Sequence, residues 1–343
     1  MRIELKDGAG GEAMEKIIRE IISAYDFSDY GEVPLSALDD SAVVEGVAFT
    51  TDSYTVRPIF FPGGDIGRLA ISGTVNDLCA IGAKPMAIST AMIVEEGFSL
   101  EDLKKIVGSM ASTAKEANVA IVTGDFKVVE KGSVDKIFIT ASGIGKRHPL
   151  LDENLKKANC HARWLMDSNL RKGDKIIITG YVGDHGIAVM TARGEYGVES
   201  NIKSDVAPLH RVLERSLEIG GVVALKDPTR GGVAEALNEW SLKSKVGIEL
   251  YEKEIPVREE VASICELLGI DPLTLGNEGK FLIAVRENYA EDVLECIREL
   301  PESKDARIIG EVTEEHNYVV LRTEVGGRRI VERPIGDPVP RIC

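Results

Sequence analysis

The sequence predicts a two-domain α+β protein that ends in a proline-rich tail. Its 343 residues exceed the length at which a single hydrophobic core stops growing, and 44% of them are hydrophobic. Segments with strand and helix periodicity alternate in both halves, and a polar, irregular stretch at about 146–173 separates the halves. We therefore expect an N-terminal domain over 1–150, a C-terminal domain over 151–333 and a tail over 334–343.

In the first half, the spacing of apolar residues places three helices between short strands. Apolar residues from Met14 to Tyr25 share one helical face, directly after a glycine-rich turn. A second helix is expected over 65–81, and a third begins at Ser99, where Asp102 completes a capping-box pattern. A strand or hairpin is expected over 42–51, and strands are expected over 86–94, 119–123 and 134–144. The strand at 119–123 should be short, buried and end at Gly124 and Asp125.

The second half repeats this alternation and then changes character. A strand is expected over 175–179, and helices should begin at 183–186 and 227–232 and cover 289–300. The three prolines of the tail, Pro334, Pro338 and Pro340, exclude a helix or a central strand. Extended polyproline-like geometry, at about 3.1 Å per residue, gives the tail a reach of roughly 30 Å, enough to carry Cys343 between sites.

Composition narrows the class of protein. The 41 basic and 56 acidic residues give a net charge of −15, which disfavours a nucleic-acid partner. The sequence has neither a signal-peptide h-region nor a run of about 18 apolar residues, so we expect a cytoplasmic protein with no membrane span. The five cysteines are scattered without a C-x-x-C pair, and all except Cys343 are expected to be ordinary structural residues.

Three sets of residues point to nucleotide chemistry. Gly8, Gly10 and Gly11 precede a helix, where backbone N–H groups and the helix dipole can hold phosphate; a plain flexible turn is the alternative. Glycines also flank the charged residues of 227–232 and 277–279, although such segments are commonly just turns.

The third set consists of aspartates at the ends of elements, namely Asp39, Asp40, Asp52, Asp77 and Asp125, with Asn76 and Lys127 close by in sequence. Magnesium binds through a few carboxylates together with phosphate oxygens and water, so the set predicts a nucleotide–metal site, whereas each aspartate alone is typical of a cap or turn.

Taken together, these segments resemble the HypE family of carbamoyl dehydratases, hydrogenase maturation proteins of the superfamily that includes aminoimidazole ribonucleotide synthetase and selenophosphate synthetase. The resemblance covers nearly the whole chain. It rests on D-G-A-G-G at 7–11, L-D-D-S-A at 38–42, F-P-G-G-D-I-G-R at 61–68, G-T-V-N-D-L at 73–78, T-G-D-F-K-V-V at 123–129, G-D-H-G-I-A at 183–188, D-P-T-R-G-G at 227–232, N-E-G at 277–279 and P-R-I-C at 340–343.

The resemblance implies a fold and an activity. The fold would be PurM-like, with an N-terminal sheet that forms a β-barrel with a second copy in a homodimer, a C-terminal α/β sandwich and a flexible tail. A partner, HypF, would place a carbamoyl group on Cys343; ATP would drive its dehydration to a thiocyanate; and the cyano group would pass to a HypC–HypD complex for the iron of nickel–iron hydrogenase.

Site residues follow by the same resemblance. Cys343 would carry the group, and Lys127 and Glu278 would be catalytic, with the choice of base between them open. The residues expected to bind ATP are Gly8, Gly10, Gly11, Asp40, Asn76, Asp227 and Arg230, and those expected to hold Mg²⁺ are Asp39, Asp52, Asp77 and Asp125.

Two features depart from the family pattern. Phe126 stands where a threonine usually lies between the aspartate and lysine of the T-G-D motif. The segment 148–171, with Cys160, His161 and Trp164, is longer than its usual counterpart. We expect it to be a surface elaboration; the alternative, a metal pair at Cys160 and His161, lacks further ligands.

Two other functions compete with this assignment. Selenophosphate synthetase or thiamine monophosphate kinase would share the nucleotide motifs, but the former is expected to keep a reactive Cys or Sec near its N-terminus, and no cysteine precedes Cys79. A non-enzymatic scaffold could carry a ligand on its terminal thiol, and the acidic and glycine-rich loops argue against it.

Overall fold

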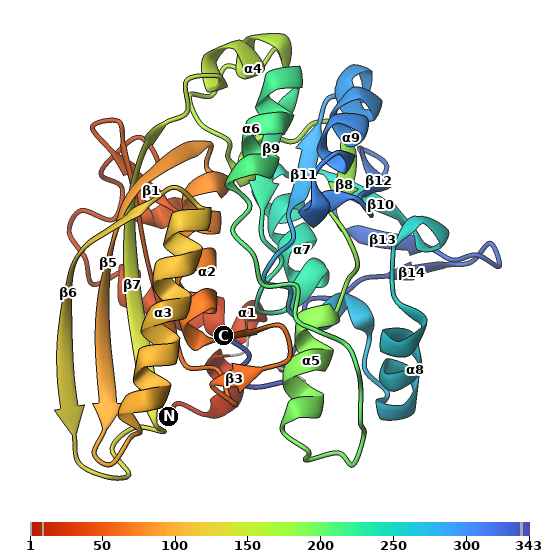
Figure 1. Ribbon diagram of the computed structural model, residues 1–343. Helices are drawn as coiled ribbons and strands as arrows, with labels where there is room; N and C mark the ends of the chain where they lie inside the picture. Colours follow the sequence, from red (N-terminus) through yellow and green to blue (C-terminus); the bar gives the residue numbers. More distant parts are fainter. Residues whose placement is uncertain (1, 9, 337–338) are drawn as a thin grey trace.

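Two β-sheets, one from each half of the chain, form the frame of the molecule (Figure 1). The computed structural model describes residues 2–8, 10–336 and 339–343. Ala9 of the glycine-rich motif and Asp337 and Pro338 of the tail therefore lie outside the described residues, so the expectations that involve them stay predictions.

The N-terminal sheet has five strands in the order β1-β2-β7-β5-β6, and only β5 and β6 run parallel. Helices α2 (Ile66–Ala80) and α3 (Leu100–Glu116) pack on one face, and α1 (Gly11–Ile22) lies toward the other domain. The strands are β1 (Ala42–Val44), β2 (Val47–Tyr54), β5 (Ala83–Glu95), β6 (Ala120–Val129) and β7 (Ile137–Arg147), with the short pair β3 (Phe60–Phe61) and β4 (Gly64–Asp65) before α2.

Local sequence signals account for the helix starts. The predicted helix start at Ser99 is confirmed, because its hydroxyl accepts a hydrogen bond from the N–H of Asp102 at 3.3 Å. Asp65 caps α2 in the same way, at 2.7 Å from the N–H of Gly67. The helices predicted near 14–25 and 65–81 are therefore confirmed to within a few residues.

The strand expected over 119–123 was wrong in length and burial. β6 continues through Gly124 and Asp125 to Val129, and almost all of its residues are exposed. The reason is topological: β6 is the edge of the sheet and pairs with β5 along its whole length, so its pattern of apolar residues does not indicate burial in this chain.

The face of the N-terminal sheet opposite α2 and α3, here called the open face, is rich in apolar side chains. Strand register places Phe49 of β2, Ile144 of β7 and Ile93 of β5 on it, with exposed fractions of 48%, 37% and 37%. The alternate residues of these strands point to the helices and are buried. Such an uncovered apolar face is typical of an interaction surface.

The C-terminal sheet has seven strands in the order β14-β13-β10-β12-β8-β11-β9. Its central strands are buried on both faces: Ile177 packs with α5, α6 and α9, whereas Ile176 and Ile178 pack with α7 on the other side. The strands are β8 (Lys175–Ile178), β9 (Val222–Lys226), β10 (Gly247–Tyr251), β11 (Leu282–Val285), β12 (Arg307–Thr313), β13 (Val319–Arg322) and β14 (Arg328–Ile330). The helices are α5 (Asp184–Ala192), α6 (His210–Ile219), α7 (Gly232–Ser244), α8 (Glu259–Leu268) and α9 (Ala290–Arg298), which confirms those expected at 183, 227 and 289.

The segment 148–171 is not the surface elaboration that we expected. It contains α4 (Leu151–Lys157), and the side chains of Leu151, Trp164 and Asp167 are buried. Trp164 donates a hydrogen bond to Glu32 in the first half, and the Asn154 amide bonds both backbone groups of Val222 in the second. The correction has a physical reason: the segment connects the two sheets, so its apolar residues are covered by both. Among the described residues, no cluster of three or more candidate metal ligands forms around Cys160 and His161 or anywhere else.

In the described part of the chain, no helix combines the length and apolarity that crossing a bilayer requires.

Candidate functional site

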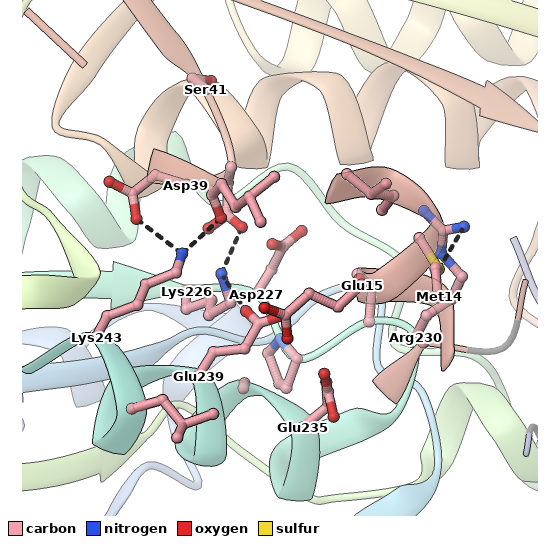
Figure 2. Close-up of a pocket in the computed structure, with 18 of the residues that line it drawn as sticks. Met14, Glu15, Asp39, Ser41, Lys226, Asp227, Arg230, Glu235, Glu239 and Lys243 are labelled. Carbon is pink, nitrogen blue, oxygen red and sulfur yellow. Dashed lines mark hydrogen bonds and ion pairs between the residues drawn. The ribbon is translucent and has the colours of Figure 1, made fainter. Parts of the chain in front are cut away.

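A cavity of about 800 Å³ opens between α1, the loop at 38–42 and the end of β9 (Figure 2). It joins segments that the sequence analysis singled out separately. Its lining includes Gly10, Gly11, Asp39, Asp40, Asp227 and Arg230. Gly8 and Asn76 are not among the lining residues, although both were expected to bind ATP.

The glycine turn requires its glycines. Gly10 and Gly11 have φ values of +87° and +73°, which residues with a Cβ rarely adopt. A Cβ on Gly11 would also lie 2.2 Å from the carbonyl oxygen of Pro334 at the root of the tail. The turn therefore delivers the free N–H groups of the α1 N-terminus to the cavity wall and at the same time contacts the tail.

Two lysines that the sequence analysis missed organise one side of the cavity. Lys226 Nζ lies 2.7 Å from Asp40 Oδ1, and Lys243 Nζ lies 3.1 Å from Asp39 Oδ1 (Figure 2). Both ammonium groups also contact Asp167 Oδ2, at 3.1 Å and 2.7 Å. One signal was available: Lys226 ends an otherwise apolar strand directly before Asp227, where a buried charge needs a partner.

The same surroundings shift the pKa values of Asp167 and Asp39 in opposite directions. Burial opposes ionisation of Asp167, but Lys226 and Lys243 outweigh it and lower its pKa to about 2. Burial raises the pKa of Asp39 to about 7, and repulsion by Asp167 adds to the rise. Asp39 Oδ2 is buried without a hydrogen-bond partner, so this carboxylate has an unused acceptor.

A second group of acids gathers deeper in the site. Asp77 of α2 accepts a hydrogen bond from Thr50 Oγ1 at 2.8 Å, and burial, then Asp227 and Asp52, raise its pKa well above the usual range. Burial and Asp40 raise the pKa of Asp227 to about 8. The fold thus crowds carboxylates from a helix, a strand and two loops around a region with too little positive charge to neutralise them.

Glu278 belongs to this group. Its side chain is 2% exposed, and Oε1 has no hydrogen-bond partner. Burial, followed by the charges of Asp227, Asp205 and Asp52, raises its pKa well above the ordinary value, while Arg230 opposes the rise. Glu278 is therefore a buried carboxyl group that readily holds a proton.

The side chain of Asn76 is engaged with backbone groups of the second half of the chain, and its expected contact with ATP stays a prediction. Its side chain is fully buried; Oδ1 accepts from the N–H of Leu209 at 2.8 Å, and Nδ2 donates to the carbonyl of Ala207 at 3.2 Å. Because both amide atoms are already engaged with backbone, Asn76 holds the segment beside Glu278.

Asp125 and Lys127 lie apart from this group within the single chain. Both side chains are exposed and form an ion pair with each other on β6. Register through β7 and β5 puts them on the open face, three strand spacings or roughly 14 Å from β2. Asp52 instead points to the opposite face, toward α2.

Cys343 ends inside the molecule. Its carbonyl oxygen accepts a hydrogen bond from the N–H of Thr55 at 2.9 Å, and Val339 and Ile342 are buried. The charge of Cys343, and more weakly those of Asp52 and Glu278, raise the pKa of Arg230, so Arg230 interacts with both the chain terminus and the acidic group. None of the five cysteines, all of which lie among the described residues, forms a disulfide; Cys79 and Cys265 are buried, as expected of structural residues, and burial raises the pKa of Cys265 to about 11.

The acidic group suits a magnesium ion that takes most of its ligands from phosphate and water. Within the described residues, no three candidate ligands converge into a ready-made metal cage. The unpartnered oxygen of Asp39 and the raised pKa values of Asp77 and Asp227 nevertheless mark a surplus of acidic oxygen atoms that a cation would stabilise.

The sequence matches two family models and a curated relative over nearly its whole length. "AIR synthase related protein, N-terminal domain" matches 38–146, and "AIR synthase related protein, C-terminal domain" matches 171–322. The carbamoyl dehydratase HypE of Escherichia coli (strain K12) is 42% identical over 350 residues, covering 99% of this chain and 99% of that protein.

Two solved structures are similar in both sequence and fold. A crystal structure of a HypE–HypF complex has 48% identity and a TM-score of 0.85 and covers 94% of this chain and 100% of that one. A crystal structure of HypE in complex with ATP has 39% identity and a TM-score of 0.80 and covers all of both chains. The two-domain PurM-like fold expected from the motifs is therefore confirmed.

Proposed function

The chain belongs to the HypE family of carbamoyl dehydratases, and from this premise we propose that it uses ATP to dehydrate a carbamoyl group carried on its own Cys343. The product is a protein thiocyanate that supplies cyanide for the iron of nickel–iron hydrogenase. The observation that carries the proposal is the docked tail: Thr55 binds the carbonyl of Cys343, and the charge of Cys343 acts on Arg230, which also interacts with the buried Glu278.

The chemistry balances without an external oxidant or reductant. The carbamoyl oxygen attacks the γ-phosphorus of ATP, so that a C–O–P linkage forms and ADP leaves. Loss of both N–H protons and cleavage of the C–O bond then release phosphate and leave Cys343 bearing S–C≡N. Overall, the thiocarbamate and ATP give the thiocyanate, ADP and phosphate.

Glu278 is the proposed acceptor of the nitrogen protons. A carboxyl group with a raised pKa is a stronger base than an ordinary glutamate, which suits it to accept a proton. Arg230 offsets negative charge next to the leaving phosphate, and the N-terminus of α1 at Gly10 and Gly11 offers N–H donors to the nucleotide.

Magnesium is part of the proposal. Asp39, Asp52 and Asp77 are the residues of this chain that would hold it, with Asp40 and Asp227 beside them. When bound, the ion neutralises phosphate charge and orients the γ-phosphoryl group.

We further propose that the active form is a homodimer joined through the open face. The exposed apolar side chains of Phe49, Ile93 and Ile144 favour burial against a second copy. Asp125 and Lys127 lie on the same face and would then act at the site of the other copy, as metal ligand and catalytic residue.

The partners and location follow from the reaction. A HypF-type enzyme would load the carbamoyl group, as the similar HypE–HypF complex suggests, and a HypC–HypD complex would accept the cyano group. A cytoplasmic location suits a reaction that consumes ATP and needs Cys343 as a free thiol.

Intact-mass measurement tests the proposal against a purely passive carrier. Protein incubated with HypF, carbamoyl phosphate and ATP should gain a carbamoyl group on Cys343 and then lose one water. Cys343→Ala should bind ATP but gain neither modification. A carbamoyl adduct that never dehydrates in the presence of ATP and magnesium would support the carrier instead.

A further inference from the structure

The last five residues of the chain are held by groups from both domains. The carbonyl oxygen of Ile342 lies 2.9 Å from His185 Nε2, and that of Arg341 lies 2.9 Å from Arg193 Nη2. Arg193 Nη2 also donates to the carbonyl of Pro340, and Thr55 Oγ1 donates to that of Cys343 at 3.1 Å. Four consecutive carbonyl groups, at 340–343, are therefore engaged.

Side chains of the tail add to this backbone recognition. Ile342 is 3% exposed, and its Cδ1 would lie only 3.1 Å from a Cβ placed on Gly276. Arg341 Nη1 lies 2.7 Å from Asp135 Oδ2. A shift of the tail by one residue would lose the side-chain contacts of Ile342 and Arg341, so these two residues specify the docked register.

His185 is fixed in one orientation by its surroundings. Its ring is fully buried and meets the Phe61 ring edge-to-face at a centroid distance of 5.4 Å. Because the Ile342 carbonyl can only accept, Nε2 carries the proton, and Nδ1 accepts from Ser204 Oγ at 2.8 Å. Burial lowers the pKa of His185, which favours this neutral form.

The residue after Ser204 holds the proposed base. Asp205 Oδ1 accepts from the N–H of Glu278 at 3.1 Å, and the Ser204 N–H is anchored on the carbonyl of Pro62 at 2.7 Å. Two consecutive residues thus connect the tail contact of His185 to the backbone of Glu278.

We propose that His185 and Arg193 are positioning residues for dehydration, which clamp the carbonyl groups of 340–342 and, through Ser204 and Asp205, fix the Cys343 cargo relative to Glu278. The inference rests on the proposed function. Recognition through carbonyl groups suits a carrier whose sulfur changes from thiol to thiocarbamate to thiocyanate, because the clamped groups are the same in all three states.

The clamp is tested first without any turnover, by the rate at which iodoacetamide alkylates Cys343 in the full-length, unmodified protein. Peptide mapping separates Cys343 from the other cysteines. Arg193→Gln and His185→Ala should each raise the rate about fivefold to tenfold, because a hydrogen bond to a docked carbonyl is lost. Arg211→Gln, at an arginine that is half exposed and 3.9 Å from Glu302, is the control and should react like wild type. Equal rates in all four proteins would overturn the clamp.

The positioning role is tested by single-turnover dehydration of pre-carbamoylated protein at varied ATP. Arg193→Gln should lower the maximal rate about tenfold and leave the ATP concentration for half-maximal rate unchanged. His185→Gln keeps a donor toward Ile342 and should recover most of the rate lost in His185→Ala. Arg193 is partly exposed, so its variant keeps the test open if His185→Ala does not fold.

The outcomes distinguish the two proposals. Faster alkylation with an unchanged maximal rate would mean that the clamp only stores the tail, and the positioning proposal would be wrong. A wild-type protein that protects Cys343 but never forms thiocyanate would instead contradict the proposed function.

Discussion

Single residues around the cavity differ in charge state according to what surrounds them. Asp167 is held ionised by two lysines, whereas Asp227 and Glu278 have carboxylate neighbours and raised pKa values. All three are acidic side chains with less than a tenth of their surface exposed. The charge state of each acid is therefore set by neighbouring residues from other elements. These neighbours distinguish Asp167, a structural acid, from Asp227 and Glu278, which are proposed to act in the site.

Replacing Asp167 by Asn should destabilise the protein by about 3–5 kcal/mol, because Lys226 and Lys243 would lose their shared counter-charge in a buried site. Urea unfolding at neutral pH measures this free energy. Asp152→Asn is the matched control: its ion pair with Arg147 is exposed, and the loss should be within about 1 kcal/mol. A similar small loss in both variants would contradict the network.

The same residue predicts a pH dependence. The folded-state pKa of Asp167 is about 2, below the ordinary 3.8, so its ionic contribution is complete above pH 3.8 and is lost as pH falls toward 2. By linkage this contribution is roughly 2 kcal/mol. The difference in unfolding free energy between wild type and Asp167→Asn should therefore shrink between pH 5 and pH 3; a difference that grew over this range would have the wrong sign.

Glu278→Gln should retain ATP affinity and lose thiocyanate formation by at least about a hundredfold, the scale of general-base catalysis. The amide is similar in size but cannot accept the nitrogen proton. ATP binding by calorimetry and single-turnover dehydration on carbamoylated protein provide the two measurements. Weaker ATP binding with normal dehydration at saturating ATP would show that the role was assigned wrongly.

At the scale of elements, β6 carries two proposed functional residues that lie apart from the rest of the site within a single chain. It has a free edge and exposed side chains, and it carries Asp125 and Lys127 away from the acidic group at Asp52 and Asp77. A strand with these properties is stabilised by pairing or by cover from another surface. Phe126, the departure from the family pattern, lies on this same strand and is half exposed, so the described part of the single chain gives it no partner surface either.

Subunit mixing tests whether Lys127 acts across the dimer. Lys127→Ala and Cys343→Ala proteins should each be inactive alone, and mixed dimers should regain dehydration, because the Cys343 of one copy meets the Lys127 of the other. Intact mass after dissociation and reassociation measures the fraction converted. Mixtures as inactive as their components would place Lys127 in its own chain's site or remove it from the mechanism.

At the scale of the whole molecule, the main features are the docked C-terminal tail and the open face of the N-terminal sheet. The tail occupies the region between the sheets, where Thr55 of the first half and His185 of the second contact it. Its root contacts the nucleotide side, because Arg333 pairs with both Glu15 of α1 and Glu235 of α7. The tail is therefore docked in this structure, and its expected role as a flexible carrier stays a prediction.

Ile144→Glu should convert a dimer into a monomer, because it places a charge at the centre of the open face. Sedimentation velocity measures the change. Leu267→Glu, at a residue that is 72% exposed on α8, is the control and should leave the oligomeric state unchanged. A wild-type protein that sediments as a monomer would contradict the proposed dimer.

Local features were predictable because neighbouring residues encode them. Hydrophobic periodicity located most helices and strands, Ser99 with Asp102 marked the start of α3, and glycines marked the turn at Gly10 and Gly11 where φ is positive. The motifs also named most of the carboxylates that gather at the site and the cysteine at the chain end. Each of these signals depends on a few adjacent residues, so it can be identified from the sequence without knowing how the chain packs.

Only the tertiary structure decided which of these groups meet. Lys226 pairs with Asp40 across 186 positions and His185 with Ile342 across 157, and no local pattern specifies such pairs. The same packing buried the segment 148–171 that appeared polar, engaged the amide of Asn76 and left β6 exposed. The sequence by itself determined the elements, the reactive residue types and the family, whereas the pKa values, the ion-pair network and the docked register of Cys343 arise from contacts that exist only once the two sheets enclose the chain terminus.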